Sequence, residues 1–146
     1  MDIQIRKATF NDLQQILNIE NSLEHKILSN DILSSTLTKD SYYYFVVTDN
    51  DNIVGYFSAE LLVDHFDILA IAVLPKYRKQ GIASKLLNVF LDICILKNIN
   101  EIFLEVRCNN CIAINFYEKH GFKKISVRPN YYSDTKEDAY VYKRVV

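Results

Sequence analysis

The sequence predicts an α/β fold, with a central mixed β-sheet flanked by about four helices. Segments in which apolar and polar residues alternate are interleaved with segments in which apolar residues recur at spacings of three and four. Apolar residues make up 49% of the 146 residues and charged residues 24%, and there are only 3 Gly and 2 Pro. Such a composition is globular, and we expect one domain that spans residues 1–146.

A strand and two helices are predicted for the first part of the chain. Ile3 to Lys7 alternates apolar and polar residues, as a half-buried strand does. Asn11-Asp12 is a suitable helix cap, and Asn30 to Leu37 predicts a second, short helix. The first helix follows from the spacing of its apolar residues, which are Leu13, Ile16, Leu17, Ile19 and Leu23.

The middle of the chain predicts a hairpin and a central strand. Tyr42 to Thr48 and Ile53 to Leu62 are rich in aromatic and β-branched residues. The polar cluster Asp49 to Asn52 separates them, as expected for the turn of a hairpin. Phe66 to Leu74 is apolar almost throughout, which indicates a central strand, and Pro75 ends it.

The last part predicts two helices and three strands. One helix covers about Lys79 to Lys97, and the other covers Cys111 to His120, capped by Asn109-Asn110 and closed by Gly121. The apolar face of the longer helix consists of Leu86, Leu87, Phe90, Ile93 and Cys94. The strands are Ile102 to Val106, Phe122 to Val127 and Ala139 to Val145, with a loop from Arg128 to Asp138. The complete order is β-α-α-β-β-β-α-β-α-β-β.

Charge and apolar runs exclude some function classes. A net charge of −1 argues against broad, sequence-independent binding to nucleic acid. The N-terminus lacks the pattern of a secretory signal. Polar residues interrupt the longest apolar run, Ile82 to Leu96, so it cannot be a bilayer span of about 20 residues. We therefore expect a cytoplasmic protein with no membrane or direct nucleic-acid partner. The sequence does not determine the oligomeric state, for which our expectation is a monomer or weak dimer.

Cysteine usage indicates neither a disulfide framework nor a metal centre. Cys94, Cys108 and Cys111 are an odd number of cysteines in a chain expected to be intracellular. The spacing of Cys108 and Cys111 resembles half a zinc site, but no second Cys or His pair lies nearby. A redox role stays open, because a cysteine near a helix start can have a lowered pKa. We favour two incidental residues, and we expect no metal.

The residues PKYRKQGIASKLL, numbers 75 to 87, place Lys76, Arg78 and Lys79 at a helix start, where the helix dipole is already positive. Acidic or hydroxyl residues are usual there. A strand, a loop with Gly81 and a helix start form an anion-binding geometry, in which free N–H groups face a phosphate. The alternative is an ordinary solvated basic helix start, since neither a Walker motif nor a Rossmann fingerprint is present.

The stretch Arg78-Lys79-Gln80-Gly81-Ile82-Ala83 resembles the Arg/Gln-x-x-Gly-x-Gly/Ala signature of the GNAT acetyltransferases, and it follows a strand similar to the family's. The order of elements also resembles the GNAT fold across essentially the whole chain. The resemblance implies acetyl-CoA as cosubstrate, with its pyrophosphate on the motif and its pantetheine arm on the preceding strand. The cofactor-binding residues implied in this way are Ile71, Ala72, Val73, Arg78, Lys79, Gln80, Gly81, Ile82, Ala83, Ser84 and Asn110.

Further motifs are similar to those of the RimI group within this family. They are Leu104 to Arg107, Asn110, Ala113 to Phe122, Arg128 to Tyr132 and Glu137 to Ala139. Enzymes of this group acetylate protein N-termini, and the namesake acts on the N-terminal alanine of a small-subunit ribosomal protein. The resemblance implies the same acceptor here. Ser22 to Leu37, one wall of the peptide groove in relatives, carries no such match. Transfer to a small amine or a lysine side chain, or a regulatory CoA-binding subunit without turnover, are the alternatives.

Glu105 and Tyr117 are the predicted catalytic residues. A carboxylate at the end of a strand can collect a proton from an N-terminal amine, whose pKa is about 8, and the resemblance assigns Glu105 as that base. Tyr117, with an ordinary pKa of about 10, can protonate the departing thiolate and matches the family's general acid. Glu105 could instead be a surface carboxylate or a partner of Arg107, and Tyr117 a half-buried core residue.

Tyr131 and Tyr132 are the predicted substrate-binding residues. The resembled enzymes hold the substrate N-terminus with this segment, and aromatic walls can seat a short peptide. The two rings could instead pack under their own loop. Of the histidines, we expect His120 to be structural, and His25 and His65 to be solvated or satisfied by local contacts.

Overall fold

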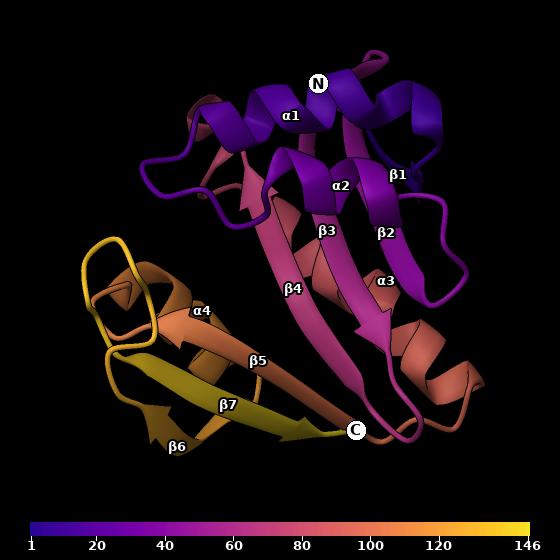
Figure 1. Cartoon of the computed structure of the whole chain (residues 1–146). Helices are drawn as coiled ribbons and strands as arrows, with labels where there is room; N and C mark the ends of the chain where they lie inside the picture. Colours follow the sequence, from indigo (N-terminus) through magenta and orange to yellow (C-terminus); the bar gives the residue numbers. More distant parts are fainter.

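The computed structural model describes residues 1–146, which form one seven-stranded sheet with helices on both faces (Figure 1). The helices are α1 (Leu13–Asn21), α2 (Asn30–Thr36), α3 (Ile82–Leu96) and α4 (Cys111–Lys119). The strands are β1 (Ile3–Lys7), β2 (Tyr42–Asp49), β3 (Asn52–Leu61), β4 (Phe66–Val73), β5 (Glu101–Arg107), β6 (Lys123–Arg128) and β7 (Ala139–Val145). None of the helices has both the length and the apolar character needed to cross a membrane.

The sheet is mixed, as predicted. Its strand order is β1-β2-β3-β4-β5-β7-β6, which puts β4 at the centre. Only β4 and β5 are parallel, and every other neighbouring pair is antiparallel. The predicted α/β fold with about four helices and the central position of the Phe66 strand are therefore confirmed.

The largest difference from the predicted boundaries is at the start of α3. The sequence pattern placed that start at about Lys79, whereas α3 begins at Ile82. Pro75–Tyr77 forms a single 3-10 turn, and the backbone φ angles of Lys79 and Gly81 are 63° and 79°. A left-handed residue cannot continue a right-handed helix, so the residues before Ile82 form a loop.

The cap ahead of α1 also differs from the prediction. Thr9 precedes the first helical turn, and its N–H donates to the Asp12 carboxylate at 2.8 Å. The same carboxylate accepts two hydrogen bonds from Arg6, at 2.8 and 2.9 Å, and these are the first cause of its lowered pKa. Asp12 therefore ties β1 to the helix start instead of capping α1 with its side chain.

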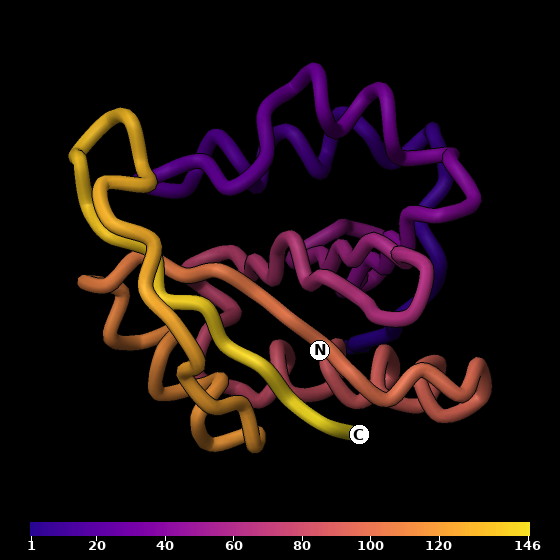
Figure 2. The backbone as a smooth tube through the Cα atoms, turned by 60° about the horizontal axis from the view of Figure 1, so that its bottom comes forward, coloured from indigo at the N-terminus to yellow at the C-terminus, as the bar shows by residue number.

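Two hydrophobic cores lie on opposite faces of the sheet. Helices α1 and α2 cover one face, and α3 and α4 cover the other (Figure 2). Phe90 of α3 lies at the centre of the core between the sheet and helices α3 and α4. Its ring centroid is 4.7 Å from that of Phe57 and 4.8 Å from that of Phe66. The predicted apolar face of α3 is confirmed, because Leu86, Leu87, Phe90 and Cys94 are buried and Ile93 is partly buried.

The parallel strands β4 and β5 pair over three residues and then separate (Figure 1). The pairs run from Phe66 with Ile102 to Ile68 with Leu104. Beyond them, β4 stays paired with β3 and β5 stays paired with β7. The edges that face each other across this split therefore present backbone N–H and C=O groups without a strand partner.

A buried carboxylate ties α1 to the sheet. Glu20 is fully buried, and it accepts hydrogen bonds from the Tyr56 hydroxyl and, at 2.9 Å, from the Ile27 N–H. Replacing Tyr56 by Phe leaves a Glu20 oxygen buried without its donor, so we expect the free energy of unfolding to fall by about 2 kcal/mol. Urea unfolding measures this loss. Tyr43→Phe is the control, because the Tyr43 ring packs on Phe66 without a hydrogen bond from its hydroxyl. Equal stabilities for the two variants would contradict the expectation.

Candidate functional site

Helix α3 begins with free N–H groups that follow an exposed loop. Gly81 is the N-cap residue, and no side chain caps the helix. A Cβ atom added to Gly81 would meet no atom within 4 Å, so glycine is required there by its φ of +79° and not by crowding. The first N–H groups of a helix have no acceptor within it, which leaves those of Ile82, Ala83 and Ser84 available to an anion.

Basic residues surround this helix start. Lys76, Arg78 and Lys79 are exposed, and none of them forms an ion pair with a carboxylate of the protein. Arg78 Nε donates to the Val73 carbonyl oxygen at 2.9 Å, which holds the side chain against the end of β4. Uncompensated cations beside a positive helix end are unfavourable alone, so the arrangement suits a bound diphosphate.

The side chain of Ser84, one of the predicted cofactor-binding residues, contacts α4. Its hydroxyl lies 3.0 Å from Nε2 of His120. Burial, followed by the charges of Lys119 and Arg144, lowers the pKa of His120 and favours the neutral ring. The backbone N–H of Ser84 is therefore the group left available to an anion, whereas its hydroxyl links two helices. His120 is structural through this contact and not through a positive charge at the helix end.

Ile71, Ala72 and Val73 lie on the arm of β4 that borders the split. They pair with β3 on one side and have no partner on β5. The free edge can hydrogen-bond an extended chain that contains amide groups, in the manner of an added strand. Their predicted role in binding a pantetheine arm stays a prediction.

Both ends of α4 have the predicted caps. Asn110 Oδ1 accepts a hydrogen bond from the Ala113 N–H at 3.2 Å. Gly121, with φ of +86°, follows the last turn in the left-handed conformation. The cap fixes where α4 starts and so sets the direction of its Tyr117 side chain.

Tyr117 projects from α4 into the core beneath α3. Its ring lies against Phe116 and Phe122, with centroids 5.4 and 5.5 Å away, and burial raises the pKa of its hydroxyl. The hydroxyl forms no hydrogen bond within the protein, yet Ser58 Oγ is the only fully enclosed side-chain oxygen without a partner. The Tyr117 oxygen therefore reaches accessible space, and its proton is free for donation to a ligand.

Glu105 occupies the opposite face of β5. Val106 packs in the same core as Tyr117, so the alternation along a strand turns Glu105 toward the side covered by α1 and α2. Its side chain is 30% exposed, and its Oε1 lies 3.4 Å from Arg128 Nε. Interaction with the Glu105 carboxylate is the first cause of the raised pKa of Tyr131. Glu105 is thus an accessible carboxylate between a cation and a phenol.

Tyr131 and Tyr132 stand in the loop between β6 and β7, with ring planes at 88° and centroids 5.1 Å apart. Tyr131 is half exposed, whereas the partly buried Tyr132 ring centroid lies 4.0 Å from the Arg107 guanidinium carbon. Burial raises the pKa of Tyr132 to about 12. The alternative that Arg107 is the partner of Glu105 is wrong, because Arg107 binds carboxylates of the loop instead.

The structure brings Glu105 and Tyr131 together and places Tyr117 across β5 from them. No hydrogen bond joins Glu105 to Tyr117, and the ion-pair partner of Glu105 is Arg128. The two lie on opposite sides of the β5 arm that borders the split. A group that binds in the split would therefore have a carboxylate on one side and a phenol on the other.

Three residues of this region were given no role from the sequence, namely Arg128, which lies in a RimI-like motif, Asp134 and His25. His25 Nδ1 lies 3.3 Å from Asp134 Oδ2, and the His25 side chain is 37% exposed. His25 is therefore partly solvated, as expected, but its partner is distant in the chain and not local. Strand pairing explains the position of the loop, because Arg107 of β5 pairs with Ala139 at the start of β7. Knowledge of that pairing would have indicated that the preceding loop residues lie near Arg107.

The remaining candidates from the sequence lie apart from this region. His65 has a local partner as expected, with its Nδ1 2.8 Å from Asp64. Cys94 is buried, which raises its pKa to about 11, and Cys108 and Cys111 are free thiols. No group of three or more His, Cys, Asp or Glu side chains is arranged to hold a metal ion.

Comparison with known proteins identifies the family. Residues 10–122 match the model of the acetyltransferase (GNAT) family. An N-alpha-acetyltransferase from Saccharolobus solfataricus is 33% identical over 158 aligned positions, which cover 98% of this chain and 93% of that protein. The crystal structure of the ribosomal-protein-S18-alanine N-acetyltransferase from Escherichia coli aligns with a TM-score of 0.91 at 28% identity, and covers 99% of this chain and 94% of that one. Arabidopsis thaliana NAA60 in complex with acetyl-CoA has the same fold, with a TM-score of 0.89 at 17% identity over 99% of both chains. The resemblance drawn from the motifs is confirmed, and this chain belongs to the GNAT family of acetyltransferases.

Proposed function

We propose that this protein transfers the acetyl group of acetyl-CoA to a protein N-terminal amine, and that the acceptor is a ribosomal protein that begins with alanine. The observation that carries the proposal is the split between β4 and β5, with Glu105 and Tyr117 on either side of its β5 arm. The N-terminus of α3, which follows β4 in the chain, adds an anion site. The acceptor is inferred from the RimI-like motifs and from the similarity to the Escherichia coli S18-alanine enzyme.

The residues of α3 and β4 fit the two polar parts of acetyl-CoA. The free N–H groups of Ile82 to Ser84, with Arg78 and Lys79 beside them, would bind the diphosphate. The unpaired edge of β4 from Ile71 to Val73 would hydrogen-bond the amides of the pantetheine arm. When bound, acetyl-CoA supplies an activated thioester carbonyl. NAA60, which shares the fold, binds acetyl-CoA in its crystal structure.

Neutralising the cations ahead of α3 should weaken CoA binding. For Arg78→Gln/Lys79→Gln we expect the Kd of CoA to rise about tenfold at 0.1 M salt, since two charge-assisted contacts to phosphate are lost. Both residues are exposed and free of ion pairs, and the only hydrogen bond lost is that from Arg78 to the Val73 carbonyl, so the free energy of unfolding should fall by no more than about 1 kcal/mol. Calorimetric titration measures the Kd. Lys39→Gln/Lys123→Gln removes the same charge elsewhere, and equal affinities of the two double variants would make the stretch an ordinary basic helix start.

Glu105 and Tyr117 divide the proton transfers of amide formation. The neutral amine attacks the thioester carbonyl carbon, an N–C bond forms and the C–S bond breaks. Glu105, directly or through one water, takes the proton that the amine must lose. Tyr117 donates its hydroxyl proton to the departing sulfur, and its raised pKa keeps that proton in place until the sulfur is charged. Solvent then returns the two residues to their starting protonation states.

Tyr131 and Tyr132 are proposed to hold the acceptor. Tyr131 lies beside Glu105 and is half exposed, so its ring and hydroxyl can contact the first residue of a peptide whose amine approaches the carboxylate. Tyr132 packs against Tyr131 and supports its orientation. An N-terminal alanine has a small side chain that leaves room for such a contact.

An assay of free thiol separates turnover from mere CoA binding. The protein is mixed with acetyl-CoA and a short peptide that begins with alanine, and released CoA is followed with a thiol reagent. We expect release that depends on the peptide and saturates with its concentration. Binding of CoA in a calorimeter without any release of thiol would overturn the proposed activity.

A further inference from the structure

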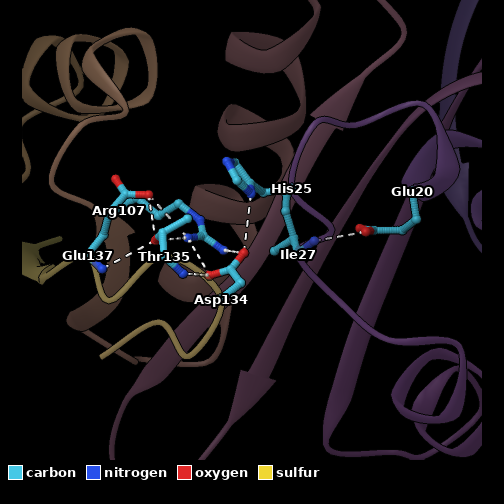
Figure 3. Close-up of polar contacts among 7 residues, drawn as sticks. All are labelled: Glu20, His25, Ile27, Arg107, Asp134, Thr135 and Glu137. Carbon is cyan, nitrogen blue, oxygen red and sulfur yellow. Dashed lines mark hydrogen bonds and ion pairs between the residues drawn. The ribbon is translucent and has the colours of Figure 1, made fainter. Parts of the chain in front are cut away.

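Arg107 is the centre of a polar cluster at the end of β5 (Figure 3). Its two terminal nitrogens donate to the two carboxylate oxygens of Asp134, at 3.0 and 3.1 Å. One of them also lies 3.2 Å from Thr135 Oγ1 and 3.4 Å from Glu137 Oε1. Only 16% of the Arg107 side chain is exposed. A bidentate pair with this burial orders its partners far better than an exposed ion pair does.

The loop that Arg107 contacts is the one that carries the two tyrosines. The planar guanidinium stacks on Tyr132, and Tyr132 packs edge-on against Tyr131. Backbone hydrogen bonds close the segment on itself, because the Tyr132 N–H donates to the Glu137 carbonyl and the Lys136 N–H donates to the Tyr132 carbonyl. The conformation of this segment therefore depends on a residue of β5, outside the loop.

Asp134 extends the cluster across to the segment between α1 and α2. His25 Nδ1 contacts Asp134 Oδ2, and Ile27 of the same segment is held by the buried Glu20 (Figure 3). In Figure 2 the loop between β6 and β7 lies beside this segment. The loop between β6 and β7 reaches Glu105 through Tyr131, and it contacts the segment between α1 and α2 through Asp134. Arg107 thus connects the strand that holds Glu105 to this loop and, through Asp134, to the segment that carries His25.

We infer that Arg107 is a positioning residue for the acceptor: it fixes Tyr132 and, through Asp134, holds the tyrosine loop against the segment that carries His25. This inference rests on the proposed function for what the loop binds. A loop that is ordered before binding costs the acceptor less free energy than one that must be ordered during binding. Loss of the cluster should therefore weaken acceptor binding more than it slows the chemical step, and it should not affect acetyl-CoA.

Arg107→Lys tests this inference, because lysine keeps the charge but lacks the planar fork. We expect the KM for the acceptor peptide to rise about tenfold, with kcat and the KM for acetyl-CoA within about twofold. In the absence of any substrate, hydrogen exchange of the Tyr132 and Lys136 amides should accelerate at least about tenfold. Arg6→Lys breaks the other bidentate arginine pair of the chain, with Asp12, and should change neither readout.

Asp134→Asn is the second variant, because Asp134 is half exposed and its replacement does not threaten folding. It should raise the acceptor KM and the Lys136 exchange rate in the same direction as Arg107→Lys, and the double variant should be no worse than Arg107→Lys alone. Hydrogen exchange needs no turnover, so it tests the ordering of the loop separately from the activity. A wild-type protein that fails to acetylate peptides would contradict the proposed function but not the ordering of the loop by Arg107. Unchanged exchange, or faster exchange with an unchanged acceptor KM, would overturn the positioning role. A fall in kcat at constant KM would overturn it as well.

Discussion

Replacing Tyr117 by Phe is expected to lower kcat by about 100-fold and to leave the affinity for CoA unchanged, because only the proton donor is removed. The ring contacts with Phe116 and Phe122 remain in the variant. The hydroxyl has no partner within the protein, so its loss leaves no buried group unsatisfied and should not reduce stability. Steady-state kinetics with saturating acetyl-CoA and peptide measure the effect, and calorimetry measures CoA binding.

Tyr140→Phe is the matched control for this variant. Tyr140 of β7 is partly buried against the core that contains Tyr117, and its ring contacts Lys124, but it is no part of the proposed site. Its replacement should change kcat by less than about twofold. If the Tyr117→Phe enzyme is as fast as wild type, Tyr117 is not the general acid, and its role is that of a core residue.

Replacing Glu105 by Gln is expected to reduce kcat/KM for the acceptor by about 100-fold near pH 7, where most N-terminal amines are still protonated. The amide cannot take a proton from the amine. At pH 9 the amine is largely neutral already, so the defect should shrink to about tenfold or less. A pH profile from 6 to about 9 for wild type and variant measures this change.

Glu101→Gln provides the comparison on the same strand and the same face. Glu101 forms an ion pair with Lys143 at the other end of β5, away from Tyr131. Its replacement should leave the pH profile intact. A small and uniform effect of Glu105→Gln at every pH would make Glu105 a structural partner of Arg128 instead of a base.

Local sequence signals predicted most of the fold. The Ala139–Val145 strand has the predicted boundaries, and the polar cluster after Thr48 does form the hairpin turn, with positive φ at Asn50 and Asp51. Asn110 and Gly121 cap α4 as predicted. Each of these features depends on the chemistry of a few consecutive residues and can therefore be predicted from the sequence. The predicted start of α3 was wrong because Lys79 has a left-handed backbone conformation, which ends a helix. Lysine is a good helix former, so its presence in the sequence does not indicate such an interruption.

Only those residues of the candidate site that lie in a family motif could be predicted from the sequence. Glu105, Tyr117 and the α3 loop were named from the family resemblance, and their roles stay predictions. The contacts of Arg107 with Asp134, and of Asp134 with His25, join residues that are distant in the chain. They follow from the β5–β7 pairing and from the fold of two loops, which no local spacing encodes. Arg128 was likewise missed as the cation beside Glu105.

Transfer to an N-terminal amine is tested most directly by a pair of peptides with one sequence that begins with alanine and contains one lysine. In the first peptide the lysine is blocked by acetylation and the N-terminus is free; in the second the N-terminus is blocked and the lysine is free. Mass spectrometry after incubation with acetyl-CoA locates any new acetyl group. We expect acetylation of the first peptide alone, at its alanine amine. Acetylation of the second peptide at lysine, with none of the first, would contradict the proposed function.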